Sequence, residues 1–111
     1  MEPISRGDIV LAAVAGDFGK PRPWLVVQAD KYNARNQPNS VLVCPLTTYA
    51  DPLSYRIAVE LELGDDKRLS WVMVDKLMAI RRERIKHKIC SVPLKAFHEV
   101  EAAMKDLLGI I

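Results

Sequence analysis

The sequence predicts a mainly β protein of the α+β class, in which a small, strongly curved antiparallel sheet or barrel is closed by a C-terminal helix. Three observations support this fold class. Short apolar runs separated by turn residues occupy most of the chain before residue 75, residues 53–61 alternate apolar with polar side chains, and apolar side chains recur every three or four positions over residues 94–108. We expect about five to seven strands.

The length and charge of the chain indicate one domain. Half of the 111 residues are hydrophobic, so residues 1–111 are expected to share one core. There are 16 lysines and arginines against 14 aspartates and glutamates, so any basic surface must come from local clustering. The N-terminus lacks an apolar signal core and no apolar run is long enough to span a bilayer, which predicts a soluble, cytoplasmic protein without a membrane partner.

The two cysteines are expected to be reduced thiols. Cys44 and Cys90 lie far apart, without a CxxC or Cys/His spacing. We therefore expect no disulfide, no metal site and no cofactor.

The first two strands are expected at residues 9–14 and 24–28, which are apolar runs that would pair antiparallel. In the loop between them, Pro21 and Pro23 flank Arg22 and hold its backbone extended. A guanidinium is a permanently charged, forked donor that suits phosphate, so Arg22 is a candidate anion-binding residue. The alternative is a solvated arginine in a proline-bordered loop.

The third strand is expected at residues 41–46, after a polar loop over residues 29–40. Thr47 and Thr48 follow it directly, so two hydroxyls lie at the end of a strand. Such hydroxyls either form turn hydrogen bonds or donate to a ligand.

A hairpin is expected from the alternating strand at residues 53–61 and a returning strand at residues 70–74. Asp75 closes the second of these strands. A partly desolvated carboxylate there could accept a proton, and the alternative is a salt bridge with Lys76 or Arg82.

A run of basic side chains over residues 81–88 is either a solvated face or an electrostatic track for a polyanion. His87 in this run and His98 in the predicted helix are expected to be structural rather than catalytic. Pro93 is expected to begin the helix and Gly109 to end it, with the apolar face packed on the sheet.

Four segments carry a family resemblance when their order and spacing are taken together. They are Arg6–Val10, Lys20–Gln28, Val43–Thr47 and Val72–Lys76, with Ile80 further on. From about residue 5 to the C-terminal helix, the chain resembles the MazF/PemK (Kid) family of toxin endoribonucleases. The resemblance implies an SH3-like barrel of the CcdB/MazF type, a homodimer, and a metal-independent ribonuclease that cuts single-stranded RNA at short sequences. It also implies a cognate antitoxin whose disordered tail lies in the substrate groove.

The resemblance also implies catalytic residues. Arg22 and Thr47 correspond to the family's catalytic arginine and threonine, and Asp75 to the aspartate that some members use for acid/base work. Members that use this aspartate tend to carry an arginine two positions before it, where this chain has Met73. Many members also have a longer Gly-rich loop before Arg22, so a different substrate preference is expected.

RNA cleavage without a metal uses the neighbouring 2′-hydroxyl as the nucleophile, and its products are a 2′,3′-cyclic phosphate and a 5′-hydroxyl. Arg22 suits stabilisation of the pentacoordinate phosphorane, because a guanidinium has almost no neutral form at pH 7; an acid/base part for it comes second. Thr47 is expected to orient the phosphate, and Asp75 to accept the 2′-proton.

Single-stranded RNA also requires stacking surfaces and a basic groove. Phe18 and Tyr49 are candidate stacking platforms, and Thr48 is a candidate phosphate donor. The candidate cations of a phosphate track are Lys20, Arg56, Arg81, Arg82 and Arg84. For the aromatic residues the alternative is core packing, and for the cations it is solubility.

Two rival functions stay open. One is a non-enzymatic poison that binds DNA gyrase, as the CcdB relatives on the same fold do. The other is an inactive homologue that only binds its antitoxin, which the departure at Met73 leaves possible. The presence of Arg22 together with Thr47 favours the nuclease.

Overall fold

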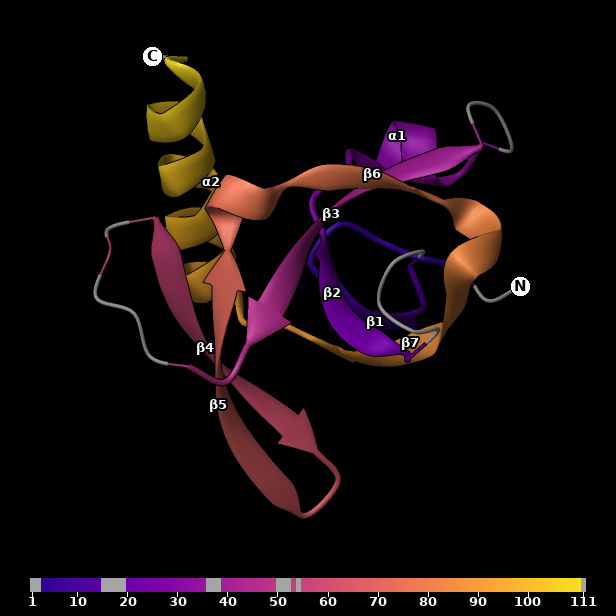
Figure 1. Ribbon diagram of the computed structural model, residues 1–111, viewed down its shortest axis with the longest axis horizontal. Helices are drawn as coiled ribbons and strands as arrows, with labels where there is room; N and C mark the ends of the chain where they lie inside the picture. The colour runs from indigo at the N-terminus through magenta and orange to yellow at the C-terminus, as the bar shows by residue number, and fades with distance from the viewer. Residues whose placement is uncertain (1–2, 15–19, 36–38, 50–52, 54, 111) are drawn as a thin grey trace.

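The computed structural model describes residues 3–14, 20–35, 39–49, 53 and 55–110 (Figure 1). The strands in these residues are β1 (Asp8–Ala12), β2 (Arg22–Val26), β3 (Ser40–Thr47), β4 (Arg56–Leu63), β5 (Asp66–Met73), β6 (Met78–Arg81) and β7 (Ile85–Ser91). The helices are α1 (Asp30–Asn33) and α2 (Leu94–Leu108), and two short 3₁₀ turns are η1 (Val74–Lys76) and η2 (Arg82–Arg84).

The strands form a curled antiparallel sheet. Their order is β4-β5-β3-β2-β1-β7, and β6 pairs with the first half of β3. Figure 1 shows the strands bending around a common interior, with α2 on one side and the β4–β5 hairpin projecting away from the body. The predicted curved antiparallel sheet with a C-terminal helix is therefore confirmed.

The sheet forks where β3 changes its partner. β3 pairs with β2 as far as Trp24 opposite Pro45, and its last two residues, Leu46 and Thr47, pair with β5 instead. Beyond that point, Arg22 of β2 pairs with Ala12 of β1, while Thr47 of β3 pairs with Trp71 of β5. Strands β2 and β5 therefore diverge on either side of the end of β3.

Both faces of the central strands are buried, which explains why these strands read as continuous apolar runs. On one face Ile9 and Leu25 belong to a cluster that includes Phe97 of α2. On the other face Val10 and Val26 belong to a second cluster. Neighbouring residues of one strand thus point into different clusters, as the two-residue period of a strand requires.

The C-terminal helix packs as the sequence predicts. Phe97, Val100 and Ala103 are its buried residues, and they lie in the cluster with the apolar side chains of β4. Gly109 ends the helix with a φ of 70°, a left-handed conformation that is least costly for glycine.

Several boundaries differ from those expected. Arg22 and Pro23 belong to β2 rather than to the loop before it. The polar segment at residues 29–40 contains α1, and residues 78–81 and 85–91 form β6 and β7, two strands that the sequence did not indicate. β6 is short and buries only Ile80, so its apolar signal is weak.

Both cysteines are free thiols. Cys44 is buried, and burial together with the charge of Asp75 raises the pKa of its thiol to about 12. Within the described part of the chain, no helix is long and apolar enough to cross a membrane.

Candidate active site

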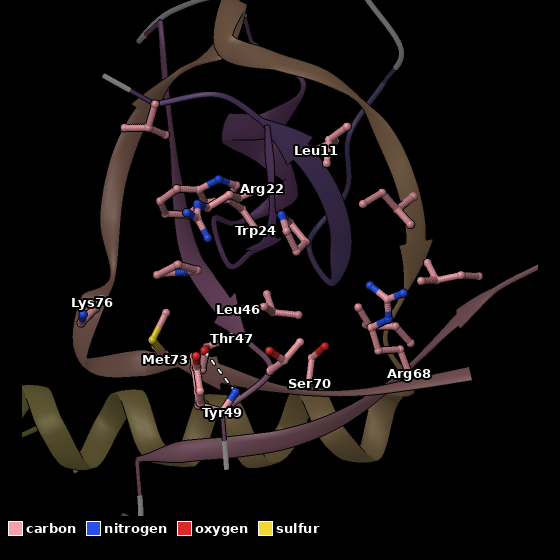
Figure 2. Close-up of a pocket in the computed structure, with 17 residues that line it drawn as sticks. Leu11, Arg22, Trp24, Leu46, Thr47, Tyr49, Arg68, Ser70, Met73 and Lys76 are labelled. Atoms are coloured by element: carbon pink, nitrogen blue, oxygen red, sulfur yellow. Dashed lines mark hydrogen bonds between the residues drawn. The ribbon is translucent and has the colours of Figure 1, made fainter. Parts of the chain in front are cut away.

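A pocket of about 690 Å³ occupies the fork between β2 and β5 (Figure 2). Its volume falls within the range of about 300–1,000 Å³ that is usual for ligand sites. Figure 2 shows Arg22 and Trp24 on one side of the pocket, with Thr47, Met73 and Ser70 facing them from the other. The pocket therefore lies where β3 changes its pairing partner from β2 to β5.

Arg22 stands at the start of β2, on a strand that is anchored by its neighbours. Trp24 is only 6% exposed, and its indole Nε1–H donates to the carbonyl oxygen of Ala12 at 3.3 Å. Pro23 fixes its own φ and has no N–H that would need a partner. The Arg22 side chain is thus exposed at the pocket while the backbone on its C-terminal side is held in the sheet.

Thr47 lies at the end of β3 with its hydroxyl held in a turn. Its Oγ1 accepts a hydrogen bond from the backbone N–H of Tyr49 at 3.2 Å, as the dashed line in Figure 2 shows. This is the turn hydrogen bond that was one alternative for the threonine pair. The hydroxyl hydrogen of Thr47 is not used by this bond, so the same group can still donate to a ligand.

The charged side chains among the described lining residues of the pocket all have the same sign. The described lining residues include three cations, Arg22, Arg68 and Lys76, and no aspartate, glutamate or histidine. Hydroxyl groups of Thr47, Thr48, Tyr49 and Ser70 also line it. A cleft lined by cations and hydroxyls concentrates anions and offers them hydrogen-bond donors.

Four of the predicted site residues meet in this pocket: Arg22, Thr47, Thr48 and Tyr49. Three polar lining residues were not expected from the sequence: Arg68, Ser70 and Lys76. Arg68 and Ser70 lie two positions apart on β5, and that spacing alone could have placed them on one face of the strand.

Asp75 lies outside this pocket and pairs with Arg56. The Arg56 Nε is 3.0 Å from Asp75 Oδ1, and an Arg56 terminal nitrogen donates to Asp75 Oδ2 at 3.3 Å. The turn η1 directs Asp75 towards α2, where it borders a separate cavity with Leu77 and Met104. The alternative of a salt bridge is thus realised, with Arg56 in place of Lys76 or Arg82, while the catalytic role of Asp75 stays a prediction.

Arg82 is also used inside the structure. It is 7% exposed, and its two terminal nitrogens donate to the carbonyl oxygens of Asn33 at 2.8 Å and Tyr32 at 3.2 Å. Its guanidinium therefore binds the end of α1 and is not presented to a ligand at the pocket.

The remaining candidates lie at the surface or beyond the described residues. Arg81 pairs with Glu83 at 3.3 Å, and Arg84 and Lys20 are exposed but do not line the pocket. Phe18 lies outside the described residues. His87 and His98 are exposed and also lie away from the pocket.

The described residues contain no group of three or more His, Cys, Asp or Glu side chains that could hold a metal ion.

Solved structures place this fold in a known class, that of MazF toxins. A chain of the MazE–MazF crystal structure (form II) from Deinococcus radiodurans superposes with a TM-score of 0.81 at 21% identity, over 100% of both chains. An endoribonuclease from a mycobacterial species superposes with a TM-score of 0.80 at 18% identity, over 99% of this chain and 95% of that one. At these identities the likeness establishes the fold alone.

The sequence relationship establishes the family. The family model described as "PemK-like, MazF-like toxin of type II toxin-antitoxin system" matches residues 5–108. The probable endoribonuclease MazF of Mycolicibacterium smegmatis is 33% identical over 109 residues, which are 95% of this chain and 96% of that protein. The chain belongs to this toxin family, and the membership predicted from the sequence is confirmed.

The Asp75–Arg56 pair leads to a stability prediction. Asp75→Asn is expected to lower the free energy of unfolding by about 1–3 kcal/mol, because the Arg56 side chain is only 13% exposed and loses its counter-charge. Urea unfolding measures the change. Glu83→Gln is the matched control, since its partner Arg81 is 73% exposed, and a shift within about 0.5 kcal/mol is expected. Equal stability of Asp75→Asn and wild type would contradict the structural role.

Proposed function

We propose that the protein is a toxin that cleaves single-stranded RNA at short sequences, without a metal ion, through attack by the 2′-hydroxyl. The observation that carries this proposal is the pocket in the β2–β5 fork, which both Arg22 and Thr47 line and whose described lining residues include three cations and no carboxylate. An RNA strand is a polyanion, and such a pocket attracts it. Cleavage would stop translation of the RNA and arrest growth.

In the proposed reaction the 2′-oxygen forms a bond to phosphorus and the bond from phosphorus to the 5′-oxygen breaks. The 2′-hydroxyl loses a proton and the leaving 5′-oxygen gains one, so the products are a 2′,3′-cyclic phosphate and a 5′-hydroxyl. Arg22 offers two parallel N–H donors to two phosphate oxygens as negative charge builds on them. The Thr47 hydroxyl donates to a non-bridging oxygen and fixes its direction.

We assign most of the rate enhancement to charge stabilisation and not to proton transfer by Asp75. The reason is that Asp75 is bound to Arg56 and borders another cavity. If this assignment holds, folded Asp75→Asn protein keeps its cleavage rate within about tenfold of wild type, whereas loss of a general base costs about 10²–10⁴-fold.

We propose that the RNA strand runs out of the pocket over the side chain of Tyr49, a residue that is 82% exposed. Stacking of a base on an exposed aromatic ring contributes about 1–3 kcal/mol and tolerates any sequence. Lys76 lines the pocket, and Thr48 adds a hydroxyl beside Thr47. Lys20, Arg81 and Arg84 are exposed cations that could extend the track outside it.

We also propose that the protein binds a cognate antitoxin and forms a homodimer. The structures of MazE–MazF from Deinococcus radiodurans and of a mycobacterial endoribonuclease with its cognate antitoxin support an antitoxin for this chain. A homodimer is supported by the cavity of about 300 Å³ between η1 and α2, whose lining is apolar except for Asp75. Leu107 and Leu108 line this cavity and are 42% and 60% exposed. The mass of the protein in solution tests the dimer.

The chemistry of the RNA ends tests the proposed reaction. Purified protein is incubated with mixed-sequence single-stranded RNA in excess EDTA, and the fragments are analysed by mass spectrometry. We expect fragments that end in a 2′,3′-cyclic phosphate and begin with a 5′-hydroxyl, because no metal-bound water takes part. Fragments with 5′-phosphates, or cleavage only after Mg²⁺ is added, would refute the mechanism. Inert protein that still binds its antitoxin would identify an inactive homologue.

A further inference from the structure

We infer that Arg68 forms a second phosphate-binding position, on the β5 wall of the pocket, which holds the RNA strand across the fork. The inference rests on the proposed RNA substrate and adds a residue that the family resemblance did not indicate. Arg22 lies on β2 and Arg68 on β5, so the two guanidinium groups are carried by the two strands that diverge at the end of β3.

The register of the β4–β5 hairpin turns Arg68 towards the pocket. Arg68 is paired with Leu61, and Ser70 with Val59, so these four side chains share one face of the hairpin. Arg68, Ser70 and Leu61 all line the pocket. In Figure 2 the Arg68 side chain extends from the hairpin towards the middle of the pocket, far from Lys76.

The acidic side chains of the hairpin do not neutralise Arg68. Glu60 and Glu62 are paired with Leu69 and Lys67, and therefore point to the opposite face. Glu60 makes its own ion pair with Lys67 at 3.7 Å. Asp66 shares the face of Arg68 at the hairpin tip but does not line the pocket, and no ion pair joins the two among the described residues.

The surroundings of Arg68 fit one nucleotide. Three half-buried lining residues, Leu11, Leu63 and Ile89, give the pocket an apolar wall, against which the flat face of a base can pack. Arg68 is exposed and lines the same pocket, so its guanidinium can bind the phosphate of that nucleotide. A phosphate contact of this kind does not depend on which base the nucleotide carries. The alternative is that the methylene stem of Arg68 simply covers the apolar wall.

A contact away from the reacting phosphate should strengthen binding of substrate and transition state alike. Its loss therefore raises KM and leaves kcat nearly unchanged. Loss of one phosphate contact to a single strand also reduces the slope of log affinity against log salt by about 0.7. These two signatures separate a phosphate contact from a change in the chemistry.

The test compares Arg68→Ala, Arg68→Met and Arg68→Lys in cleavage of single-stranded RNA and in binding of a labelled 2′-O-methyl RNA, which cannot be cleaved. Arg68→Ala and Arg68→Met are expected to raise KM and the dissociation constant about tenfold, with kcat within about twofold and a salt slope smaller by about 0.7. Arg68→Lys is expected to recover the salt slope. Lys67→Ala, on the outer face of the same strand, is the matched control and should behave as wild type.

Urea unfolding confirms that each variant is folded at the assay temperature. If Arg68→Met binds and cleaves as wild type does, the side chain only covers the wall and the inference is wrong, while the proposed function stands. If wild type neither binds 2′-O-methyl RNA nor cleaves RNA, both the proposed function and the role of Arg68 are wrong.

Discussion

Arg22→Ala is expected to lower kcat/KM for RNA cleavage by about 10²–10³-fold, which corresponds to about 2.7–4 kcal/mol of transition-state stabilisation. Arg22, at the start of β2, and Thr47, at the end of β3, both line the pocket. A preorganised donor at the developing charge acts mainly in the transition state, so the loss should fall on kcat more than on KM. Single-turnover cleavage of a short single-stranded RNA measures it.

Two control variants show whether the position of Arg22 and the two parallel N–H donors of its guanidinium matter. Lys20→Ala removes a nearby exposed cation that does not line the pocket, so kcat is expected to change less than about threefold and any loss should fall on KM. Arg22→Lys keeps the charge but not the two parallel donors, so it should recover only part of the rate. Cleavage by Arg22→Ala within about threefold of wild type would show that the proposed charge-stabilising role belongs to another residue.

The contrast between Arg22 and Arg68 shows what sequence could reveal about the site. Arg22 lies between two prolines, a local pattern that indicates an extended backbone at this residue. Thr47 directly follows an apolar run, which places it at the end of a strand. Arg68 has no such local mark. Arg68 lines the pocket because β3 pairs with β5 in place of β2 after Pro45. This pairing joins segments far apart in the sequence, so no local sequence pattern predicts it.

The elements with strong periodicity were predicted well, and those defined by pairing were not. The alternating residues of β4 and the apolar stripe of α2 have patterns long enough to be read from sequence. β6 has a single buried side chain, Ile80, and becomes a strand because β3 is there to pair with it. Tertiary pairing decides such short segments.

In the basic run at residues 81–88, the charge pattern alone does not predict which arginine is structural and which could bind a ligand. Arg81, Arg82 and Arg84 are equivalent as a charge pattern, yet only Arg82 is buried. The turn η2 separates their directions, so one guanidinium enters the protein while the others stay in water. The identity of the structural arginine depends on that turn and on the distant α1.

Arg82→Ala is therefore expected to destabilise the protein by about 2–4 kcal/mol and to leave RNA cleavage intact at low temperature. The substitution removes two charge-assisted hydrogen bonds, to the carbonyl oxygens of Asn33 and Tyr32, and leaves these acceptors near the end of α1 without their donor. The measurements are the midpoint of urea unfolding and the cleavage rate well below the thermal transition.

Arg84→Ala is the matched control, because Arg84 lies in the same turn and is exposed. It should change the free energy of unfolding by less than about 0.5 kcal/mol. A role of Arg82 in the phosphate track would give the opposite pattern, with stable protein, a raised KM and a smaller salt slope. Because the Arg82 side chain already donates to two backbone carbonyls inside the fold, binding RNA would require breaking those bonds first, and we expect the structural pattern.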